Sequence, residues 1–508
     1  MNVAQPQTRI VAATATNRAH LSRLVKAGSA ARISPGLFIV GSFDTAEGAV
    51  RRHLHDVIAL TWPGGVLCGR TALAGGVPVD GVVFVAHPGP SRRSRLDLPG
   101  VTVAPVAGPG CLAGDMPLLE SGLAISGQAR RLVENAVVRG RPAGHQAGTV
   151  AVEHEIDDLA RSGGTGRIRG TLAQLHLIAP HFAPAAVELV RGRLATVLGS
   201  FSAGEPPASD RLRARLSGTP YDHRRLELLR GLVAYLADQP PQPPIVPAAT
   251  LPQTWLPFFE AYFSNFIEGT EFGVDEARRI ALDGEVPEHR PADAHDVAAT
   301  YRLVTDPIAR SGGSATASEL QDTLRRHHSV LMAARPDKRP GHFKHVDNYA
   351  GGYRFVEAPL VEGTLVHGFH VIHQLHDPLA RAVALMVLVT ECHPFLDGNG
   401  RIARLLANAE LSRAGQVRIV VPTSYRNNYL AALSALSHGY GNGESLLAVL
   451  AFAQRWTAAI DWSDYDISLR TLEACNAFVD PGFAETTGRR LRMPGTASAG
   501  GWSIRPAR

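Results

Sequence analysis

The chain has 508 residues, of which 45% are hydrophobic and 19% are charged, with a formal net charge of +5 and an isoelectric point near 9.2. This globular composition excludes a largely disordered chain, and the length allows about three domain-sized cores at roughly 100–200 residues per domain. The charge is modest for this length, so it permits contact with nucleic acid or another polyanion without requiring it.

Cysteine spacing and hydropathy predict the compartment. Four cysteines stand far apart without a CxxC pair, which argues against a zinc site and a disulfide framework: Cys68, Cys111, Cys392 and Cys475. The N-terminus lacks a basic stretch followed by an apolar core, and apolar runs such as AVALMVLV are far too short to span a bilayer. We therefore expect a soluble protein in the reducing cytoplasm, without a membrane partner.

The first predicted elements are a short helix and a tight hairpin. TNRAHLSRLVKAG, residues 16–28, has apolar positions at helical spacing and a glycine stop, and AARISPGLFIVG, residues 30–41, places two strand-like runs around a Pro-Gly turn. This is the layout of a winged helix-turn-helix, and four basic residues on its polar positions could contact DNA phosphates: Arg18, Arg23, Lys26 and Arg32. An amphipathic helix with a solvated basic face explains the same spacing.

The same residues resemble a known family. RLVKAGSAARISPGLFIV, residues 23–40, is similar to the N-terminal winged-helix segment of AbiEi-type antitoxins, which are transcriptional regulators, and the similarity extends in order over roughly residues 8–235. It implies an α+β half with a winged-helix region over residues 1–100, an antitoxin-like region over residues 101–237, DNA as a partner and a toxin–antitoxin relationship. Within it we expect strands at residues 81–88 and 101–106, a polar loop at residues 91–95 and a helix at residues 118–137.

A proline-rich segment divides the chain. DQPPQPPIVPAAT, residues 238–250, contains prolines that forbid a helix and favour extended polyproline II, so we predict a semi-rigid linker over residues 238–253. The next domain then covers residues 254–465. Residues 466–508 form a C-terminal extension whose Gly/Ser/Arg-rich end, from about residue 486, has too little apolar side chain to stay ordered.

The second half contains HPFLDGNGR, residues 393–401, as a polar loop between two predicted helices, residues 377–392 and 402–415. Gly398 and Gly400 let successive backbone N–H groups point inward, and such a nest at a helix N-terminus binds anions. Arg401 and Arg404 stand at i and i+3 on the next helix, so both can reach the same anion. A group with several phosphates fits this arrangement best.

The acid and the histidine of this loop complete the chemistry. Asp397 beside phosphates calls for a divalent cation, and Mg²⁺ is held by one or two carboxylates together with substrate phosphates. His393 can take a proton near neutral pH and so serve as the general base for an incoming hydroxyl. Alone, each residue has an ordinary structural explanation, such as a turn or a solvated face; their contiguity favours a phosphoryl-transfer site.

Residues 393–404 match the signature HxFx(D/E)GNGRxxR of the Fic family without departure. The resemblance implies an all-α Fic domain with a β-hairpin flap, which transfers AMP from ATP to a Ser, Thr or Tyr hydroxyl of a target protein, with Mg²⁺ as cofactor. It gives His393 the role of base and Asp397 that of magnesium ligand, and it packs Phe395 into the core. The phosphate-binding residues that it implies are Gly398, Asn399, Gly400, Arg401 and Arg404.

Two further segments resemble parts of this family. Residues 341–359 resemble the flap hairpin that holds the target segment by strand pairing, with Gly351, Gly352, Tyr353 and Arg354 at its tip; a plain surface loop is the competing interpretation. SNFIEG resembles the inhibitory motif (S/T)xxxE(G/N), whose members here are Ser264, Glu268 and Gly269. In that role Glu268 pairs with Arg404 and takes the place of the ATP γ-phosphate.

Residues 424–436 occupy the place where the family contributes to the nucleoside pocket, with Tyr425 and Tyr429 as candidates; at i and i+4 on a helix they are equally well explained as core residues. We thus predict an autoinhibited protein adenylyltransferase with a DNA-binding N-terminal module. Removal of AMP from a modified protein and a nucleotide-sensing transcriptional regulator are the alternatives. The target, the operator and the homo-oligomeric state are left open by the sequence.

Overall fold

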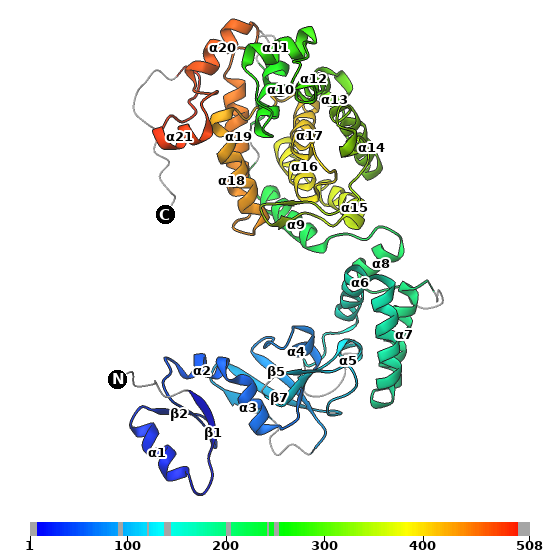
Figure 1. The fold of residues 1–508 in the computed structure, drawn as a ribbon, viewed down its shortest axis with the longest axis vertical. Coiled ribbons are helices and arrows are strands. Elements are labelled where there is room, and N and C mark those ends of the chain that lie inside the picture. Colours follow the sequence, from blue (N-terminus) through cyan, green and yellow to red (C-terminus); the bar gives the residue numbers. More distant parts are fainter. Residues whose placement is uncertain are drawn as a thin grey trace. The chain divides into compact units, whose positions relative to one another are not determined.

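The computed structural model describes residues 8–89, 95–118, 121–136, 144–199, 205–240, 243–247 and 253–495 (Figure 1). The chain divides into two compact units, Met1–Ser217 and Gly218–Arg508. The division falls ahead of the proline-rich segment at which the sequence predicted it, because α9 (His223–Ala237) packs against helices of the second unit. Part of the predicted linker belongs to the second unit as well, since the carbonyl of Ile245 accepts a hydrogen bond from Val417 N at 2.8 Å.

The first unit begins with a three-stranded antiparallel sheet of order β1-β3-β2. Its elements are β1 (Arg9–Ala12), α1 (Arg18–Lys26), β2 (Ala30–Ser34) and β3 (Leu37–Val40), followed by α2 (Ala46–Arg52) and α3 (Leu54–Thr61). The predicted helix and hairpin are thus both present. Leu21, on the apolar face of α1, is buried. The four basic residues Arg18, Arg23, Lys26 and Arg32 are all exposed.

A six-stranded mixed sheet of order β6-β7-β5-β4-β9-β8 forms the centre of this unit. Its strands are β4 (Val66–Leu67), β5 (Val82–His87), β6 (Leu96–Leu98), β7 (Val101–Ala107), β8 (Met116–Leu118) and β9 (Leu123–Ile125). The helices are α4 (Gly69–Leu73), α5 (Gln128–Asn135), α6 (Thr149–Ile178), α7 (Pro184–Val197) and α8 (Asp210–Leu216), with a 3₁₀ turn at Ala179–His181. The two strands predicted from the sequence are confirmed, and residues 91–94 of the predicted loop lie outside the described residues.

The helix predicted over residues 118–137 is wrong in its first half. Residues 123–125 form β9, which pairs in parallel with β4, and the helix begins only at Gln128. Gly127 lies between the two elements. Only glycine fits there, because a Cβ would lie 2.0 Å from the carbonyl oxygen of Gly114. The apolar triplet of β9 is buried by pairing in the sheet, so a tertiary contact overrides the helical spacing.

The second unit is helical apart from one short hairpin. Its remaining helices are α10 (Leu256–Ile267), α11 (Val274–Asp283), α12 (Pro291–Thr305), α13 (Pro307–Ser311), α14 (Ala317–Leu331), α15 (Val361–Ile372), α16 (Pro378–Cys392), α17 (Asn399–Arg413), α18 (Arg426–Ser437), α19 (Glu444–Ala458), α20 (Tyr465–Ala474) and α21 (Pro481–Thr487). Three 3₁₀ turns, Pro336–Lys338, Ala358–Leu360 and Thr423–Tyr425, and the hairpin of β10 (Tyr349–Ala350) and β11 (Tyr353–Arg354) complete it. The predicted all-α class is confirmed for this unit.

Helices α16 and α17, yellow in Figure 1, lie at the centre of the second unit and pack against each other. Both are buried along most of their length. Asp377 caps α16 by accepting a hydrogen bond from Ala380 N, and Pro378 stands in the first turn, where its missing N–H is not needed. This pair of helices holds the polar loop 393–398 between them.

The C-terminal extension stays attached to the second unit further than the sequence predicted. The backbone N–H of Arg492 donates to Cys475 O, and the indole N–H of Trp456 donates to Arg492 O. Residues 496–508, the end of the predicted disordered tail, lie outside the described residues.

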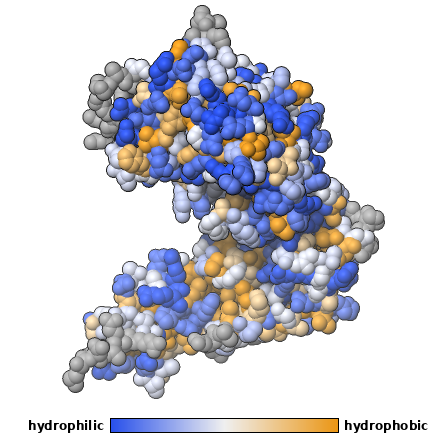
Figure 2. Space-filling view, turned by 45° about the horizontal axis from the view of Figure 1, so that its top comes forward, coloured by the Kyte–Doolittle hydropathy of each residue, from blue (hydrophilic) through white to orange (hydrophobic). Residues whose placement is uncertain are grey.

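On the face seen in Figure 2, hydrophilic residues of the helical unit are interspersed with small hydrophobic groups. Every helix in the described part of the chain is too short or too polar to cross a membrane.

Candidate active site

The polar loop is closed by its own asparagine. Oδ1 of Asn399 accepts a hydrogen bond from Phe395 N, and its Nδ2 donates to Phe395 O, both at 2.9 Å. Gly398 precedes α17 with φ of 75°, and a Cβ there would lie 3.1 Å from Met332 Sδ, so both the backbone and the packing require glycine. The side chain of Asn399 therefore shapes the loop, and the binding of phosphates by this segment stays a prediction.

The imidazole of His393 is neutral at physiological pH. Its Nδ1 lies 3.1 Å from the carbonyl oxygen of Thr390, and because a carbonyl only accepts, Nδ1 carries the hydrogen and Nε2 keeps its lone pair. The ring stacks on Phe355 with centroids 3.7 Å apart at 10°. Burial, helped by the charge of Lys344, lowers the pKa of His393 to about 4. A group that is neutral at physiological pH can accept a proton there.

Lys344 is a buried residue beside this base that the sequence did not single out. Its Nζ donates to Asn348 Oδ1 at 2.6 Å and to Cys392 O at 3.3 Å. Burial lowers the pKa of Lys344 to about 8. It lies in a segment assigned to the flap, and a lone lysine there carried no signal of burial.

The N-terminus of α17 faces the carboxylate of Glu268. A Cβ on Gly400 would lie 2.3 Å from Glu268 Oε1, so only glycine allows this close approach. The first N–H groups of a helix have no partner within the helix and carry the positive end of its dipole. Glu268 therefore places a negative group next to the position where the sequence predicted bound phosphates.

Arg404 holds Glu268 and the end of α10 together. Its Nη2 lies 2.7 Å from Glu268 Oε1 and donates to Ser264 O at 2.8 Å, while Nε donates to Ser264 Oγ at 3.1 Å. Burial raises the pKa of Glu268, but Arg404 and, more weakly, Arg401 and His393 outweigh burial, so the pKa lies below its usual value. The predicted residues Ser264, Glu268 and Arg404 are thus brought together, with Gly269 directly after them.

Arg401 has a different partner from the one that the sequence suggested. Its Nη1 lies 2.9 Å from Asp296 Oδ2, and both side chains are buried, with 4% and 2% of their areas exposed. Nη1 also donates to Asn265 Oδ1 at 3.3 Å. Asp296 additionally pairs with Arg335 at 3.0 Å. Arg401 is therefore held by a core carboxylate, and nothing in the sequence of α12 distinguished Asp296 from a surface acid.

Asp397 stands on a loop that His328 supports. Nε2 of His328 lies 3.2 Å from the carbonyl oxygen of Asp397, and Nδ1 accepts a hydrogen bond from Gly341 N at 2.9 Å, so Nε2 is the donor. The His328 ring stacks on Phe395 at 3.8 Å, and burial lowers its pKa to about 4. Phe395 is fully buried, as expected. His328 is a supporting residue that sequence reasoning missed.

The carboxylate of Asp397 suits a magnesium ion that is shared with a nucleotide. Its side chain is 44% exposed, and its Oδ1 lies 3.9 Å from Arg401 Nη2. Within the residues described, no group of three or more His, Cys, Asp or Glu side chains could hold a metal ion. Mg²⁺ commonly uses one or two carboxylates and takes its other ligands from phosphates and water. Asp397 fits this role.

A hairpin forms where the flap was predicted. Tyr349 pairs with Arg354 and Ala350 with Tyr353, and the turn residues Gly351 and Gly352 have φ of 52° and 86°. Two positive φ values in a two-residue loop match the right-handed twist of the strands and favour glycine. That this hairpin holds a target segment stays a prediction.

The two tyrosines assigned to the nucleoside pocket differ. Tyr429 is buried, with its hydroxyl 3.4 Å from Met386 Sδ and in electrostatic contact with Arg404, and its role in nucleoside binding stays a prediction. Tyr425 is half-buried and packs on Phe452 with ring centroids 5.2 Å apart. A role of Tyr425 in nucleoside binding stays a prediction.

A profile of the Fic/DOC family matches residues 319–411. The matched residues contain the polar loop, the hairpin and helices α14 to α17 in whole or in large part.

Two curated relatives are the proteins called protein adenylyltransferase Fic from Drosophila virilis, 30% identical over 196 residues, and Drosophila grimshawi, 32% identical over 197 residues. Each match covers 35% of this chain and 39% of the relative, so the chain spans about two fifths of the length of these relatives.

Among solved structures, the chain is similar to Fic-1 (residues 134–508) from C. elegans, at 17% identity and a TM-score of 0.34, over 61% of this chain and 86% of that one. It is also similar to a Fic domain containing signaling protein from Bacteroides thetaiotaomicron, at 19% identity and a TM-score of 0.36, over 46% and 92%. Scores this low do not bear on the fold.

Proposed function

We propose that the chain is a protein adenylyltransferase, which transfers AMP from ATP to a hydroxyl group of a target protein. The observation that carries this proposal is the neutral His393 beside the N-terminus of α17 in a Fic/DOC domain. The names of the curated relatives support the same activity.

The reaction follows from the positions of the chain's own groups. Nε2 of His393 accepts the proton of the target hydroxyl, whose oxygen attacks the α-phosphorus of ATP. The bond from that phosphorus to the bridging oxygen breaks, and pyrophosphate leaves. The backbone amides at the start of α17 and Arg404 hold the phosphates. A magnesium ion on Asp397 would neutralise phosphate charge.

The contact between Glu268 and Arg404 restrains this activity. A γ-phosphate that binds Arg404 competes with the carboxylate for the same guanidinium, and the two negative groups repel each other. The helix α10 that ends in Glu268 is buried along nearly all of its length, so the motif is part of the fold. We infer that in the wild-type chain Glu268 competes with the γ-phosphate of ATP for Arg404. Loss of the carboxylate removes this competition.

Transfer of radioactive α-phosphate from ATP to protein tests the proposal. We expect strong labelling by Glu268→Gly, weak labelling by the wild type, and none by Glu268→Gly/His393→Ala. Equal labelling by the single and double variants would remove His393 from its role, and labelling that does not rise in Glu268→Gly would remove Glu268 from its role.

Removal of AMP from a modified protein is a second candidate. It is favoured by the electrostatic coupling between Glu268 and His393, because a carboxylate near the base could hold an attacking water. Release of AMP from a pre-labelled protein by the wild type, and not by Glu268→Gly, is the result that would favour it.

Binding of DNA by the first unit is a separate candidate. It is favoured by the four exposed basic residues of α1 and β2. Phosphate contacts make binding salt-dependent, with a slope of log K against log salt near −0.9 per contact. Replacing Arg18, Arg23, Lys26 and Arg32 by alanine in the full chain is therefore expected to weaken binding to duplex DNA and to flatten its salt dependence; an unchanged slope would contradict this role.

A further inference from the structure

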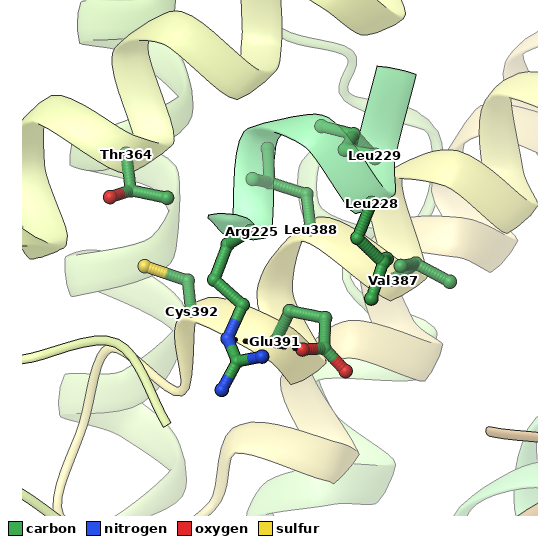
Figure 3. Close-up of a pocket in the computed structure, with 8 residues that line it drawn as sticks. All are labelled: Arg225, Leu228, Leu229, Thr364, Val387, Leu388, Glu391 and Cys392. Carbon is green, nitrogen blue, oxygen red and sulfur yellow. Dashed lines mark ion pairs between the residues drawn. The ribbon is translucent and has the colours of Figure 1, made fainter. Parts of the chain in front are cut away.

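An ion pair behind the hairpin joins Arg225, which lies before the Fic/DOC match, to Glu391, which lies within it. Arg225 of α9 and Glu391 of α16 face each other, with Nε 3.4 Å from Oε2, and most of both side chains is buried (Figure 3). The cavity beside them holds about 10 Å³, which is room for at most a single water. The cavity is therefore too small to bind a ligand. The role of the ion pair follows from the residues that it contacts.

Glu391 joins three elements besides its own helix. Its Oε2 accepts a hydrogen bond from the hydroxyl of Tyr353 at 2.6 Å, and its Oε1 accepts one from Ser437 Oγ at the end of α18. Burial and the Glu391 carboxylate raise the pKa of Tyr353, so its phenol keeps the proton that it donates. One carboxylate in the last turn of α16 thus ties the hairpin to α18 and to Arg225.

Arg225 holds the hairpin from the other side. Its guanidinium carbon lies 4.5 Å from the centroid of the Tyr353 ring, and its Nη2 donates to Arg354 O at 2.5 Å. A cation over an aromatic face is attractive, more so when it is shielded from water. Both residues of β11 are therefore fixed by a side chain of α9, an element that lies before the family match begins.

The hairpin is in turn joined to the base. Phe355, the residue after β11, stacks on the ring of His393, and Glu391 stands two residues before His393 in the same chain segment. The outer strand carries exposed apolar surface, with Tyr349 61% exposed. An extended peptide that pairs with this strand would be placed relative to His393 by the contacts of β11.

We propose that Arg225 and Glu391 are positioning residues that fix the hairpin against His393 and so set where the acceptor segment of a protein substrate lies. The proposal rests on the adenylyltransferase function for its effect on catalysis, but the clamp itself is a physical property of the chain. Loss of Arg225 frees the hairpin and misplaces the acceptor hydroxyl, while the phosphate site at α17 is left in place.

Hydrogen exchange of the full chain, read by mass spectrometry, tests the clamp independently of activity. In Arg225→Ala we expect exchange in residues 346–356 to rise about tenfold, whereas exchange at the start of α17 stays unchanged. Arg225→Lys keeps the charge but loses the planar guanidinium, so its exchange in these residues should lie between those of the wild type and Arg225→Ala. Arg224→Ala is the matched control, since Arg224 is the exposed neighbour on α9. Equal exchange in Arg225→Ala and Arg224→Ala would overturn the proposal.

Labelling in the Glu268→Gly background tests the consequence. With Arg225→Ala added, we expect transfer of labelled AMP to protein to fall about tenfold while the dissociation constant of ATP changes less than about twofold. Equal labelling would overturn the positioning role. If the Glu268→Gly parent labels no protein, the proposed function fails, while hydrogen exchange still decides the clamp. If Arg225→Ala does not fold, Tyr353→Phe takes its place in the same two measurements. This variant removes only the hydroxyl group, which donates to Glu391.

Discussion

Two regions around α17 present an acid to an arginine, and they differ in burial. Where α10 ends, Arg404 meets Glu268, whose side chain is 30% exposed; at α12, Arg401 meets Asp296, whose side chain is 2% exposed. When the first pair opens, the partly exposed carboxylate can reach water and Arg404, 9% exposed, keeps its contacts to Ser264. Separating the second pair leaves uncompensated charges in the core. The same residue type, three positions apart on one helix, is therefore available for a ligand in one region and fixed by the fold in the other.

The largest expected difference between the two regions is in stability. Asp296→Ala leaves Arg401 buried without its carboxylate, and breaking such a pair costs about 3–5 kcal/mol of unfolding free energy. Glu268→Ala also leaves a buried arginine without its carboxylate, but Arg404 keeps its two hydrogen bonds to Ser264, so the cost is expected to be smaller, about 1–3 kcal/mol. Urea denaturation followed by tryptophan fluorescence compares the two variants. Similar losses for both would contradict the distinction.

The next difference is in nucleotide affinity. Glu268→Gln frees Arg404 for phosphate, and a charge-assisted hydrogen bond corresponds to about a tenfold gain in ATP affinity. Isothermal titration with ATP and Mg²⁺ measures it, with Arg404→Ala/Glu268→Gln as the control that should lose the gain. An affinity equal to that of the wild type would show that the pair does not compete with ATP.

The third expected effect concerns the pH dependence that His393 gives to stability and labelling. Because the pKa of His393 is lowered to about 4, the native state binds fewer protons than the unfolded chain, so this group favours folding above the unfolded pKa of 6.5 and loses that contribution as the pH falls toward 4. At pH 6, labelling by Glu268→Gly should be about fourfold faster than a base with pKa 6.5 allows. An acid limb of the rate centred near pH 6.5 would contradict the buried, neutral base.

The smallest expected effect concerns the second acceptor of Arg404. Ser264→Ala removes the hydroxyl at 3.1 Å from Nε but keeps the carbonyl and Glu268 contacts. We expect labelling to rise by about twofold and stability to fall by about 0.5–1 kcal/mol, the usual contribution of a neutral hydrogen bond. Labelling as strong as that of Glu268→Gly would show that the hydroxyl, and not the carboxylate, restrains the site.

Motif residues were predictable because their chemistry is local. Gly398 and the two glycines of the hairpin turn are required by positive φ angles, which depend on the local backbone. Gly400 is required by the approach of the distant Glu268, although the motif already included it. The contact of Glu268 with Arg404 was predictable only through the family resemblance, since it joins residues far apart in the chain. The helix expected over residues 118–137 failed because the partner strand β4 decides the state of β9.

Supporting residues were beyond the reach of the sequence. Asp296, His328 and Arg225 look like ordinary surface residues of amphipathic helices until their helices pack, and only burial gives each a single partner. The boundary between the units shows the same dependence, since α9 is assigned by what it packs against and not by the prolines that follow it.

The sequence by itself determined which atoms the site contains: a base, an acid, a nest of N–H groups and two arginines in one short segment. The tertiary structure decided their states. Burial keeps the imidazole of His393 neutral, the contact with Arg404 keeps Glu268 ionised, and the core carboxylate of Asp296 holds Arg401. Desolvation and pairing depend on residues that are distant in the chain, so they are properties of the fold and not of the motif.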